Sequence, residues 1–135
     1  MNRINDKLKE VENYLEELSS IVPSKIEEYK GDNKTIAACE RYFERIVEAI
    51  IDSCFLLIKE KALKMPEEEE KVFDILEQEG ILSKQLTDKL KDAKGMRNII
   101  AHDYGKVDDE LVFEAITQQL EKDIKDFIGS IKKVL

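Results

Sequence analysis

The sequence predicts an all-α protein, an up-and-down bundle of about five helices joined by short loops. Apolar residues recur at spacings of three and four along most of the chain, and no run alternates with a period of two for long enough to form a strand. Five glycines and two prolines leave little room for linkers. A chain of 135 residues, 42% of them hydrophobic, is then most simply one domain spanning 1–135.

The first half of the chain predicts three helices. An apolar stripe marks the first, which Pro23 ends. Its members are Ile4, Leu8, Val11, Leu15, Leu18 and Val22. Ser24 followed by Glu27 fits a capping box that opens a short second helix over 25–30. The third helix, 34–61, is apolar around most of its circumference, which predicts a central position covered on several sides.

Helix boundaries in the second half are marked by proline, glycine and capping residues. Pro66 is expected to begin a short helix that stops near Gly80. Ser83 is expected to cap the next helix, with Gly105 as its C-terminal break, and Asp108 to cap the last one. The inward stripe of that last helix is expected to be Leu111, Ala115, Leu120, Ile124, Phe127, Ile131 and Leu135.

Charge and cysteine content narrow the class of protein. The net charge of −8 argues against binding of nucleic acid through a broad basic surface. The charge is uneven, however, because the segment 84–106 holds six Lys/Arg against three acids.

No apolar run approaches the ~18 residues of a membrane span, and no secretory signal precedes the charged start. Cys39 and Cys54 share one predicted helix, too far apart for a disulfide. We expect a reduced, cytoplasmic protein that does not associate with a membrane.

The residues best suited to chemistry lie between Arg97 and Tyr104, a segment that holds the only histidine, His102. Histidine titrates near neutrality and can move protons, the planar arginine matches a phosphate, and tyrosine offers a modifiable hydroxyl. On an ideal helix Arg97 and Tyr104 share a face, whereas His102 lies about 140° round from Arg97. Either the helix ends near His102 and turns the imidazole, or a two-fold dimer brings two copies of the motif together. We favour a combination.

Asp52 is a second candidate because it interrupts an apolar run, where a carboxylate is costly unless paired. Arg45 and Glu48 share its polar strip, so Asp52 could belong to a structural ion pair. It could equally anchor Arg97 or orient His102 from a neighbouring helix. The run Glu67–Glu70 is expected only to stabilise a helix N-terminus. One histidine and the absence of a CxxC pair make a metal site unexpected, and no cofactor motif is present.

The pattern Arg97-Asn98-x-x-x-His102-x-Tyr104 resembles the signature of the HepT-like subgroup of HEPN-domain proteins. Two flanking features agree. Val107-Asp108 resembles the hydrophobic-Asp pair that opens the family's last helix, and the segment 49–52 resembles its acidic helix position. The resemblance covers nearly the whole chain in length and helix order.

This resemblance implies a metal-independent RNA endonuclease that acts as a homodimer with the motif at the interface. Such proteins are commonly toxins paired with an MNT-type nucleotidyltransferase antitoxin, which can transfer AMP to the motif tyrosine, here Tyr104. His102 would move a proton between the RNA 2′-OH and the leaving oxygen, and Arg97 would stabilise the charge of the transition state. Asn98 would orient the imidazole or the phosphate, and Asp52 would hold Arg97 or His102 in place.

Two other interpretations remain open at this point. The chain could be a non-catalytic helical module that binds nucleotide or serves as partner subunit of a nucleotidyltransferase, and its acidic net charge supports that view. It could also be a plain structural bundle in which the histidine motif is only a helix C-terminal cap.

Overall fold

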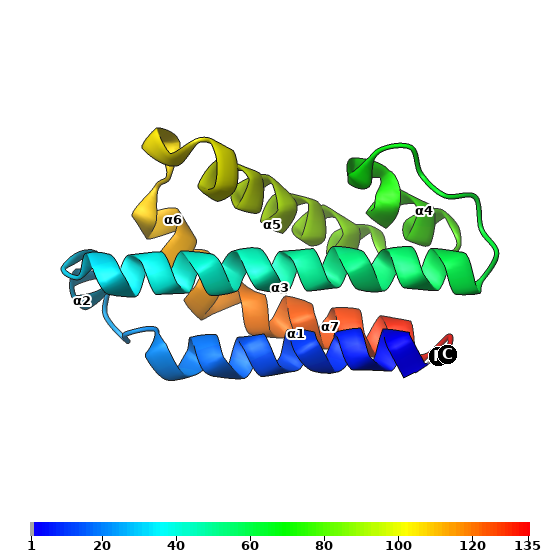
Figure 1. The fold of residues 1–135 in the computed structure, drawn as a ribbon, viewed down its shortest axis with the longest axis horizontal. Coiled ribbons are helices and arrows are strands. Elements are labelled where there is room, and N and C mark those ends of the chain that lie inside the picture. Colours follow the sequence, from blue (N-terminus) through cyan, green and yellow to red (C-terminus); the bar gives the residue numbers. More distant parts are fainter. Residues whose placement is uncertain (1) are drawn as a thin grey trace.

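The computed structural model describes residues 2–135 and confirms an all-helical bundle (Figure 1). The helices in chain order are α1 (Asn2–Ile21), α2 (Ile26–Lys30), α3 (Asn33–Glu60), α4 (Val72–Gln78), α5 (Lys84–His102), α6 (Asp109–Glu114) and α7 (Leu120–Lys132). Single 3-10 turns, η1 (Glu69–Lys71) and η2 (Tyr104–Lys106), precede α4 and α6. The six helical segments expected from the sequence are all present, and a π-helical turn divides the last one into α6 and α7.

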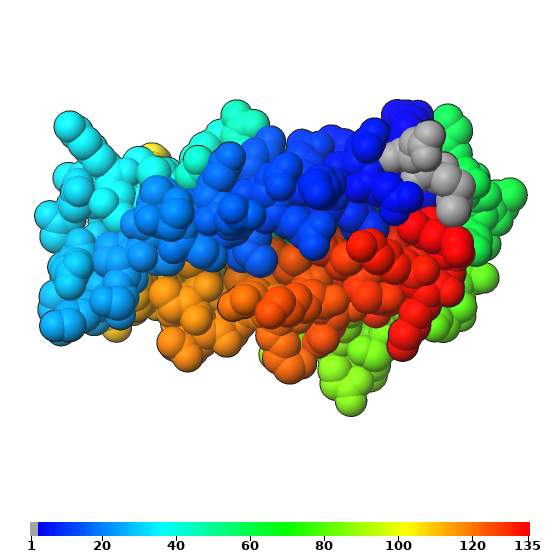
Figure 2. All heavy atoms as spheres, turned by 90° about the horizontal axis from the view of Figure 1, so that it is seen from below, coloured from blue at the N-terminus to red at the C-terminus, as the bar shows by residue number. Residues whose placement is uncertain are grey.

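Helix α3 is the centre of the bundle, as its apolar circumference predicts. It packs against α1, α4 and α5, and its buried Phe43, Cys54, Leu57 and Ile58 are at most 1% exposed. Figure 2 shows α1 and α7 side by side along one long face of the molecule. The start of α1 and the end of α7 lie at one end of the bundle, and α2 and the last turn of α5 lie at the other (Figure 1).

Local chemistry explains where most helices begin and end. Helix α1 stops at Ile21 because a proline at 23 disfavours helical backbone in the residue before it. Asp32 caps α3, accepting from the Lys34 N–H at 3.0 Å, and Ser83 caps α5, accepting from the Leu86 N–H at 3.1 Å. Gly80 closes α4 with a φ of +73°, a conformation that favours glycine.

Two predicted helix starts are wrong. The N-cap of α2 is Lys25 and makes no side-chain capping bond, so Ser24 and Glu27 form no capping box there. Pro66 does not begin a helix either, because the chain stays irregular until η1 and α4 begins only at Val72. A capping motif contributes only one hydrogen bond to the start of a helix. The positions of these two short helices are decided instead by the burial of Tyr29 and Phe73 against the bundle.

The register of the last helix also differs from the prediction. Leu111 is 55% exposed, and Val112 and Ile116 take the buried positions instead. The π-helical turn Ala115–Gln119, labelled η3, accounts for the change, because its wider turn inserts an extra residue between α6 and α7. Downstream of η3 the predicted stripe holds, with Ile124, Phe127 and Ile131 at most 1% exposed.

Both cysteines are buried and free, as their separation predicts. Among residues 2–135 no helix combines the length and the apolar character needed to cross a membrane.

The two serines at predicted helix starts, Ser24 and Ser83, provide a test of this account. Ser83→Ala should lower the free energy of unfolding by about 0.5–2 kcal/mol, because the Leu86 N–H loses its acceptor at the start of α5. Ser24→Ala is the matched control and should change it by less than about 0.5 kcal/mol, since Ser24 caps nothing. Urea unfolding followed by circular dichroism measures both. Equal losses would mean that Ser24 does cap α2.

Candidate functional site

The histidine motif lies where α5 ends and the chain reverses into α6. The helix ends at His102, and the Asp103 N–H still donates to the Ile99 carbonyl at 2.9 Å. Asp103 then leaves helical geometry with φ −138° and ψ 51°, and η2 makes one tight turn over Tyr104–Lys106. The predicted helix end near His102 is confirmed. Because Tyr104 lies beyond it, the ideal-helix face shared with Arg97 does not extend to Tyr104.

Three of the predicted residues line one open cleft of about 550 Å³ beside this helix end. Arg97, Asn98 and His102 come from the last two turns of α5, and Lys94 lies one turn earlier. Glu69 and Glu70, from the segment before α4, form the opposite wall. The 140° separation expected of Arg97 and His102 on an ideal helix therefore does not keep the two side chains out of a common cleft. The His102 side chain is exposed to solvent, and the long Arg97 side chain lines the same cleft.

Arg97 is the most enclosed of the three, with a side chain only 13% exposed. Its Nη2 atom lies 2.5 Å from Glu69 Oε1, its Nη1 atom lies 3.9 Å from Glu48 Oε2, and its buried Nε has no hydrogen-bond partner. Lys94, whose side chain is 8% exposed, lies 3.9 Å from the same Glu69 oxygen. The two cations and the two carboxylates thus neutralise one another at the base of the cleft.

The acid run Glu67–Glu70 therefore does more than was expected of it. The prediction was that it would only stabilise a helix N-terminus, but Glu69 reaches across to α5 and is the nearest anion to Arg97. Twenty-eight residues separate the two, so no local sequence pattern could pair them. The contact depends on how the segment between α3 and α4 folds back over α5.

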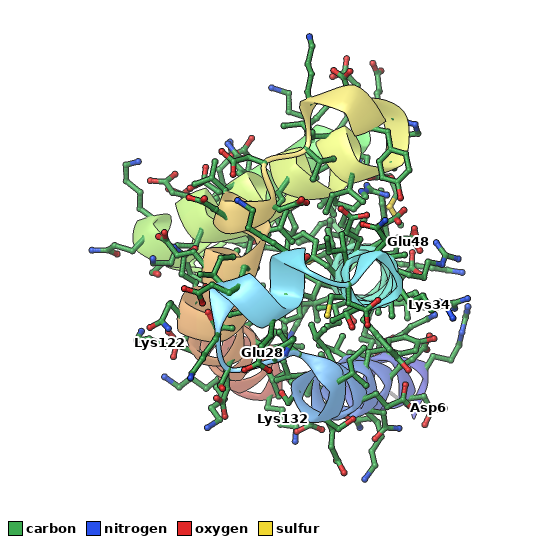
Figure 3. All side chains as sticks on the ribbon, turned by 90° about the vertical axis from the view of Figure 1, so that its left-hand side faces the viewer. Asp6, Glu28, Lys34, Glu48, Lys122 and Lys132 are labelled. Atoms are coloured by element: carbon green, nitrogen blue, oxygen red, sulfur yellow. The ribbon has the colours of Figure 1, made fainter. Side chains whose placement is uncertain are left out.

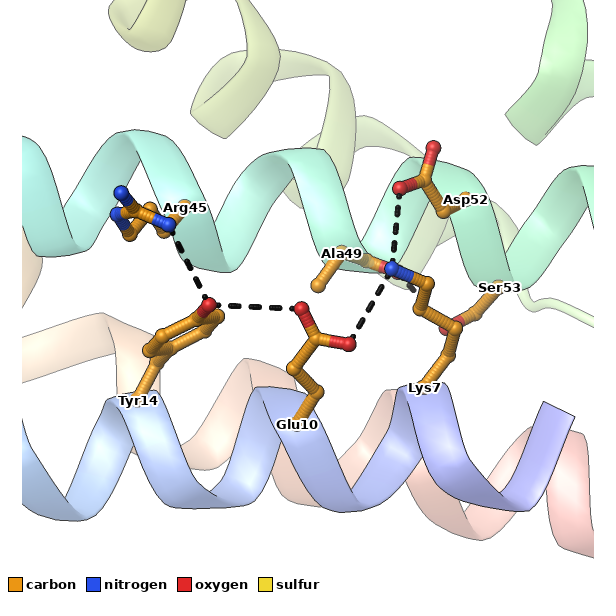
Figure 4. Close-up of polar contacts among 7 residues, drawn as sticks. All are labelled: Lys7, Glu10, Tyr14, Arg45, Ala49, Asp52 and Ser53. Carbon is orange, nitrogen blue, oxygen red and sulfur yellow. Dashed lines mark hydrogen bonds and ion pairs between the residues drawn. The ribbon is translucent and has the colours of Figure 1, made fainter. Parts of the chain in front are cut away.

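Asp52 is not near the cleft, so its expected role in holding Arg97 or orienting His102 is not supported within this chain. Its carboxylate lies 3.5 Å from Lys7 Nζ on α1, in a network that continues through Glu10 and Tyr14 to Arg45 (Figure 4). The ion-pair interpretation is the one that the structure supports. Its partner is a lysine of α1, because α1 packs along that face of α3.

Glu48 occupies the place expected for Asp52. It lies one helical turn earlier on α3 and projects on the side nearest α5 (Figure 3). A signal for it was present, because Glu48 belongs to the same polar strip as Asp52. The strip alone could not tell which of its acids faces α5 and which faces α1.

Tyr104 is 70% exposed and does not line the cleft, although its neighbour Asp103 does. The charge of Glu40 on α3, followed by slight burial and the charges of Glu44 and Asp109, raises the pKa of the Tyr104 phenol. Glu40 is only 3% exposed, and burial raises the pKa of its carboxyl, an effect that the Tyr104 hydroxyl partly opposes.

Glu40 is not among the site residues predicted from the sequence. The signal that could have found it is its position in the stripe Ile36, Glu40, Phe43, where an acid occupies an inward position of a buried helix. Such a carboxylate is costly to bury, and this cost is why the pKa of Glu40 is raised.

No group of three or more His, Cys, Asp or Glu residues in the described part of the chain is placed to hold a metal ion.

Comparisons with known proteins assign this fold and motif to a class, the HEPN proteins. The family model described as "Ribonuclease HepT-like" matches residues 11–131. A solved structure of a tri-AMPylated Shewanella oneidensis HEPN toxin, in complex with an MNT antitoxin, superposes with a TM-score of 0.89 at 25% identity and covers 96% of each chain.

Sequence relatives agree. The mRNA nuclease HepT of Shewanella oneidensis is 33% identical over 89 residues, an alignment that covers 66% of this chain and 66% of that protein. A candidate RNase of Archaeoglobus fulgidus is 28% identical over 127 residues, 92% of this chain and 94% of its own. The protein described here belongs to the HepT-like ribonuclease family, as its histidine motif predicts.

The internal neutralisation of Arg97 has a measurable consequence. Glu69→Gln should strengthen the binding of inorganic phosphate to the cleft about five- to tenfold, because it removes one charge of the wrong sign beside the arginine, worth ~1 kcal/mol or more. Glu67→Gln removes the same net charge from the same segment without touching Arg97 and is the control. Isothermal titration at low ionic strength measures both, and equal gains would show that only net charge matters.

Proposed function

We propose that this protein is a metal-independent RNA endonuclease, the toxin of a toxin–antitoxin pair, and that an MNT-type nucleotidyltransferase neutralises it. The observation that carries the proposal is the common cleft of Arg97, Asn98 and His102 at the end of α5. The names of the relatives, an mRNA nuclease and a HEPN toxin with an MNT antitoxin, support the same activity. Its substrate would be cytoplasmic RNA.

The chemistry follows from what RNA supplies. Each phosphate has a neighbouring 2′-OH that can act as an internal nucleophile. His102 takes its proton, or protonates the leaving 5′ oxygen, an effect worth about 10²–10⁴-fold. Arg97 stabilises the charge that develops on the phosphate oxygens, and Asn98 orients the imidazole or the phosphate. The products are a 2′,3′-cyclic phosphate and a 5′-hydroxyl.

Two features of the cleft suit this reaction without a metal ion. A permanent cation and a titratable imidazole perform the charge stabilisation and the proton transfer that a bound metal and its water would otherwise supply. Glu69 is paired with the guanidinium group of Arg97, the group to which an RNA phosphate would bind. We infer that an RNA phosphate displaces Glu69 when it binds.

Cleavage in the presence of EDTA is the first test. The purified protein should cut single-stranded RNA with EDTA present, and His102→Ala and Arg97→Ala should each lower the rate at least about 10²-fold while leaving helicity unchanged. Gel analysis of a labelled RNA measures the rate. Normal cleavage by His102→Ala would contradict the mechanism and favour a non-catalytic partner subunit of a nucleotidyltransferase.

We further propose that the active form is a homodimer with the motif at its interface. An apolar groove of about 340 Å³ lies beside the motif, with Met96, Ile99, Ile100, Val107 and Leu111 among its lining residues. Ile99 and Leu111 are 43% and 55% exposed in the single chain, an uncommon state for neighbouring large aliphatic side chains. A second copy would cover them and place its own His102 close to the first cleft.

Mixing inactive variants tests whether the sites are shared. Arg97→Ala and His102→Ala should each be inactive, and a mixture refolded together should recover part of the wild-type rate if the His102 of one protomer acts beside the Arg97 of its partner. Light scattering on the wild type should give a dimer at micromolar concentration. A fully active monomer would overturn this proposal.

Tyr104 is the proposed control point. Its phenol is exposed on a short turn two residues past His102, where another enzyme can reach it. An adenylyl group there would add bulk and a negative phosphodiester beside the place where an RNA phosphate binds. Steric exclusion and like-charge repulsion within about 4–6 Å would then both oppose RNA.

Tyr104→Phe keeps the ring and removes the acceptor oxygen. The variant should retain some cleavage but resist silencing by an MNT-type nucleotidyltransferase with MgATP, since no adduct can form on the ring. Intact-mass spectrometry of the co-expressed pair should show AMP on the wild type and none on the Phe variant. Equal silencing of both proteins would refute this regulatory role even if the ribonuclease assignment stands.

A further inference from the structure

Lys94 is a buried lysine to which the proposed mechanism gives no role. Its side chain is 8% exposed and lines the same cleft as Arg97, Asn98 and His102. Lysine is rarely buried, because its ammonium group is costly to remove from water unless a partner compensates for the loss. The other lysines of α5 are all exposed. The burial of Lys94 beside the histidine motif therefore indicates a function inside the cleft.

The position of Lys94 on α5 fills the angular gap between Arg97 and His102. On a helix of about 3.6 residues per turn, Arg97 lies about 60° to one side of Lys94 and His102 about 80° to the other. Asn98, four residues after Lys94, projects from the same face. Lys94 thus lies at the inner end of the face that presents the arginine, the amide and the imidazole to the cleft.

Lys94 and Arg97 converge on a single carboxylate oxygen. Glu69 Oε1 lies 2.5 Å from Arg97 Nη2 and 3.9 Å from Lys94 Nζ. Like a carboxylate oxygen, a nonbridging oxygen of a phosphodiester is anionic and accepts hydrogen bonds from both kinds of cation. The position of Glu69 Oε1 therefore marks a point at which one anionic oxygen is within reach of both cations.

The two cations differ in the partners that remain to them when Glu69 leaves. Arg97 keeps Glu48, whose Oε2 lies 3.9 Å from Nη1. Lys94 makes no other ion pair within residues 2–135. When an RNA phosphate displaces Glu69, the buried ammonium group has no counter-ion unless the phosphate itself supplies the charge, and an unpaired buried charge is strongly unfavourable.

We infer that Lys94 is a second phosphate-binding cation of the cleft, a catalytic residue that contacts the same RNA phosphate as Arg97. The inference rests on the proposed ribonuclease function, since it requires RNA to enter this cleft. In the protein without RNA, the Glu69 carboxylate occupies the place of the phosphate between the two cations. Exchange of one anion for the other keeps both cations paired.

A second cation matches the charge that develops during cleavage. The 2′ oxygen forms a bond to phosphorus as its proton moves to an imidazole, and the bond from phosphorus to the 5′ oxygen breaks. A phosphodiester carries one negative charge, and attack by the 2′ oxygen adds a second in the transition state. Arg97 offsets one of these charges and Lys94 the other. Because burial already fixes the lysine in place, this stabilisation costs little reorganisation during the reaction.

Lys94→Met removes the charge and keeps an unbranched side chain, with Lys89→Met as the matched control on the same helix. Lys89 is exposed and does not line the cleft, so each variant loses one positive charge but only Lys94→Met loses a cleft cation. Lys94→Met should lower kcat on single-stranded RNA in EDTA about 10²-fold, because the lost interaction is strongest in the transition state. Lys89→Met should stay within about threefold of the wild type. Equal rates for the two variants would overturn the inference.

A double-mutant cycle with Glu69→Gln separates phosphate binding from a role in holding Glu69 in place. If Lys94 acted only through Glu69, Lys94→Met would have no effect once Glu69 is already replaced. If Lys94 contacts the phosphate, the loss of about 10²-fold should persist in the Glu69→Gln background. Disappearance of the loss in that background would refute the inference, whatever the single variant shows.

Binding without cleavage gives a readout that a structural role would not change. A single-stranded 2′-O-methyl RNA lacks the nucleophile, so its affinity can be measured over a range of salt concentrations. The slope of log affinity against log salt should be flatter by about 0.7 in Lys94→Met, the contribution of one phosphate contact on a single strand. In Lys89→Met the slope should be unchanged. A wild-type slope in Lys94→Met would contradict a phosphate contact.

Two controls keep the outcomes distinct. Circular dichroism melting checks that each variant is folded, and Lys94→Gln, a polar and uncharged replacement, is measured in parallel and should show the same loss of rate. If the wild type neither cleaves RNA nor binds the 2′-O-methyl analogue, the proposed function fails. If the wild type cleaves RNA and Lys94→Met behaves like Lys89→Met, only the role of Lys94 fails.

Discussion

Burial of α3 on several sides is the constraint on which the rest of the structure depends. A helix packed against α1, α4 and α5 leaves its polar side chains few directions in which to find partners. Three of its five acids therefore act on three different neighbours. Asp52 pairs with Lys7 on α1, Glu48 lies 3.9 Å from Arg97 on α5, and the charge of Glu40 raises the pKa of Tyr104 beyond the end of α5. One central helix thus acts on both parts of the candidate site.

These contacts give different surroundings to Arg97 and Tyr104, which lie seven residues apart on the chain. Arg97 is enclosed and neutralised by Glu69 and Glu48, whereas Tyr104 is exposed and the charges of Glu40, Glu44 and Asp109 raise the pKa of its phenol. The end of α5 at His102 makes the separation possible, because a helix continuing past that point would have put both side chains on one face. A single short turn therefore gives the cleft and the modifiable phenol different electrostatic surroundings.

How far the sequence predicts this arrangement depends on the range of the interaction. Helix extents follow from apolar spacing, and the caps at Ser83 and Asp108 follow from local chemistry, so α1, α3 and α5 could be predicted closely. Contacts between distant segments could not. Glu69 faces Arg97 only because the loop before α4 folds back. The spacing of the polar strip on α3 does not determine whether Glu48 or Asp52 faces α5. No sequence pattern predicts the π turn that accounts for the exposure of Leu111.

The unequal exposure of the tyrosines also has a spectroscopic consequence. The chain has four tyrosines and no tryptophan, so its near-ultraviolet emission comes from phenols alone. Tyr29 is fully enclosed, Tyr14 and Tyr42 are half-buried, and only Tyr104 lies open to solvent. An aqueous quencher such as iodide or acrylamide therefore reaches one phenol in preference to the others. The native protein carries its own optical probe at the end of α5, and the state of that turn can be followed in solution without a label.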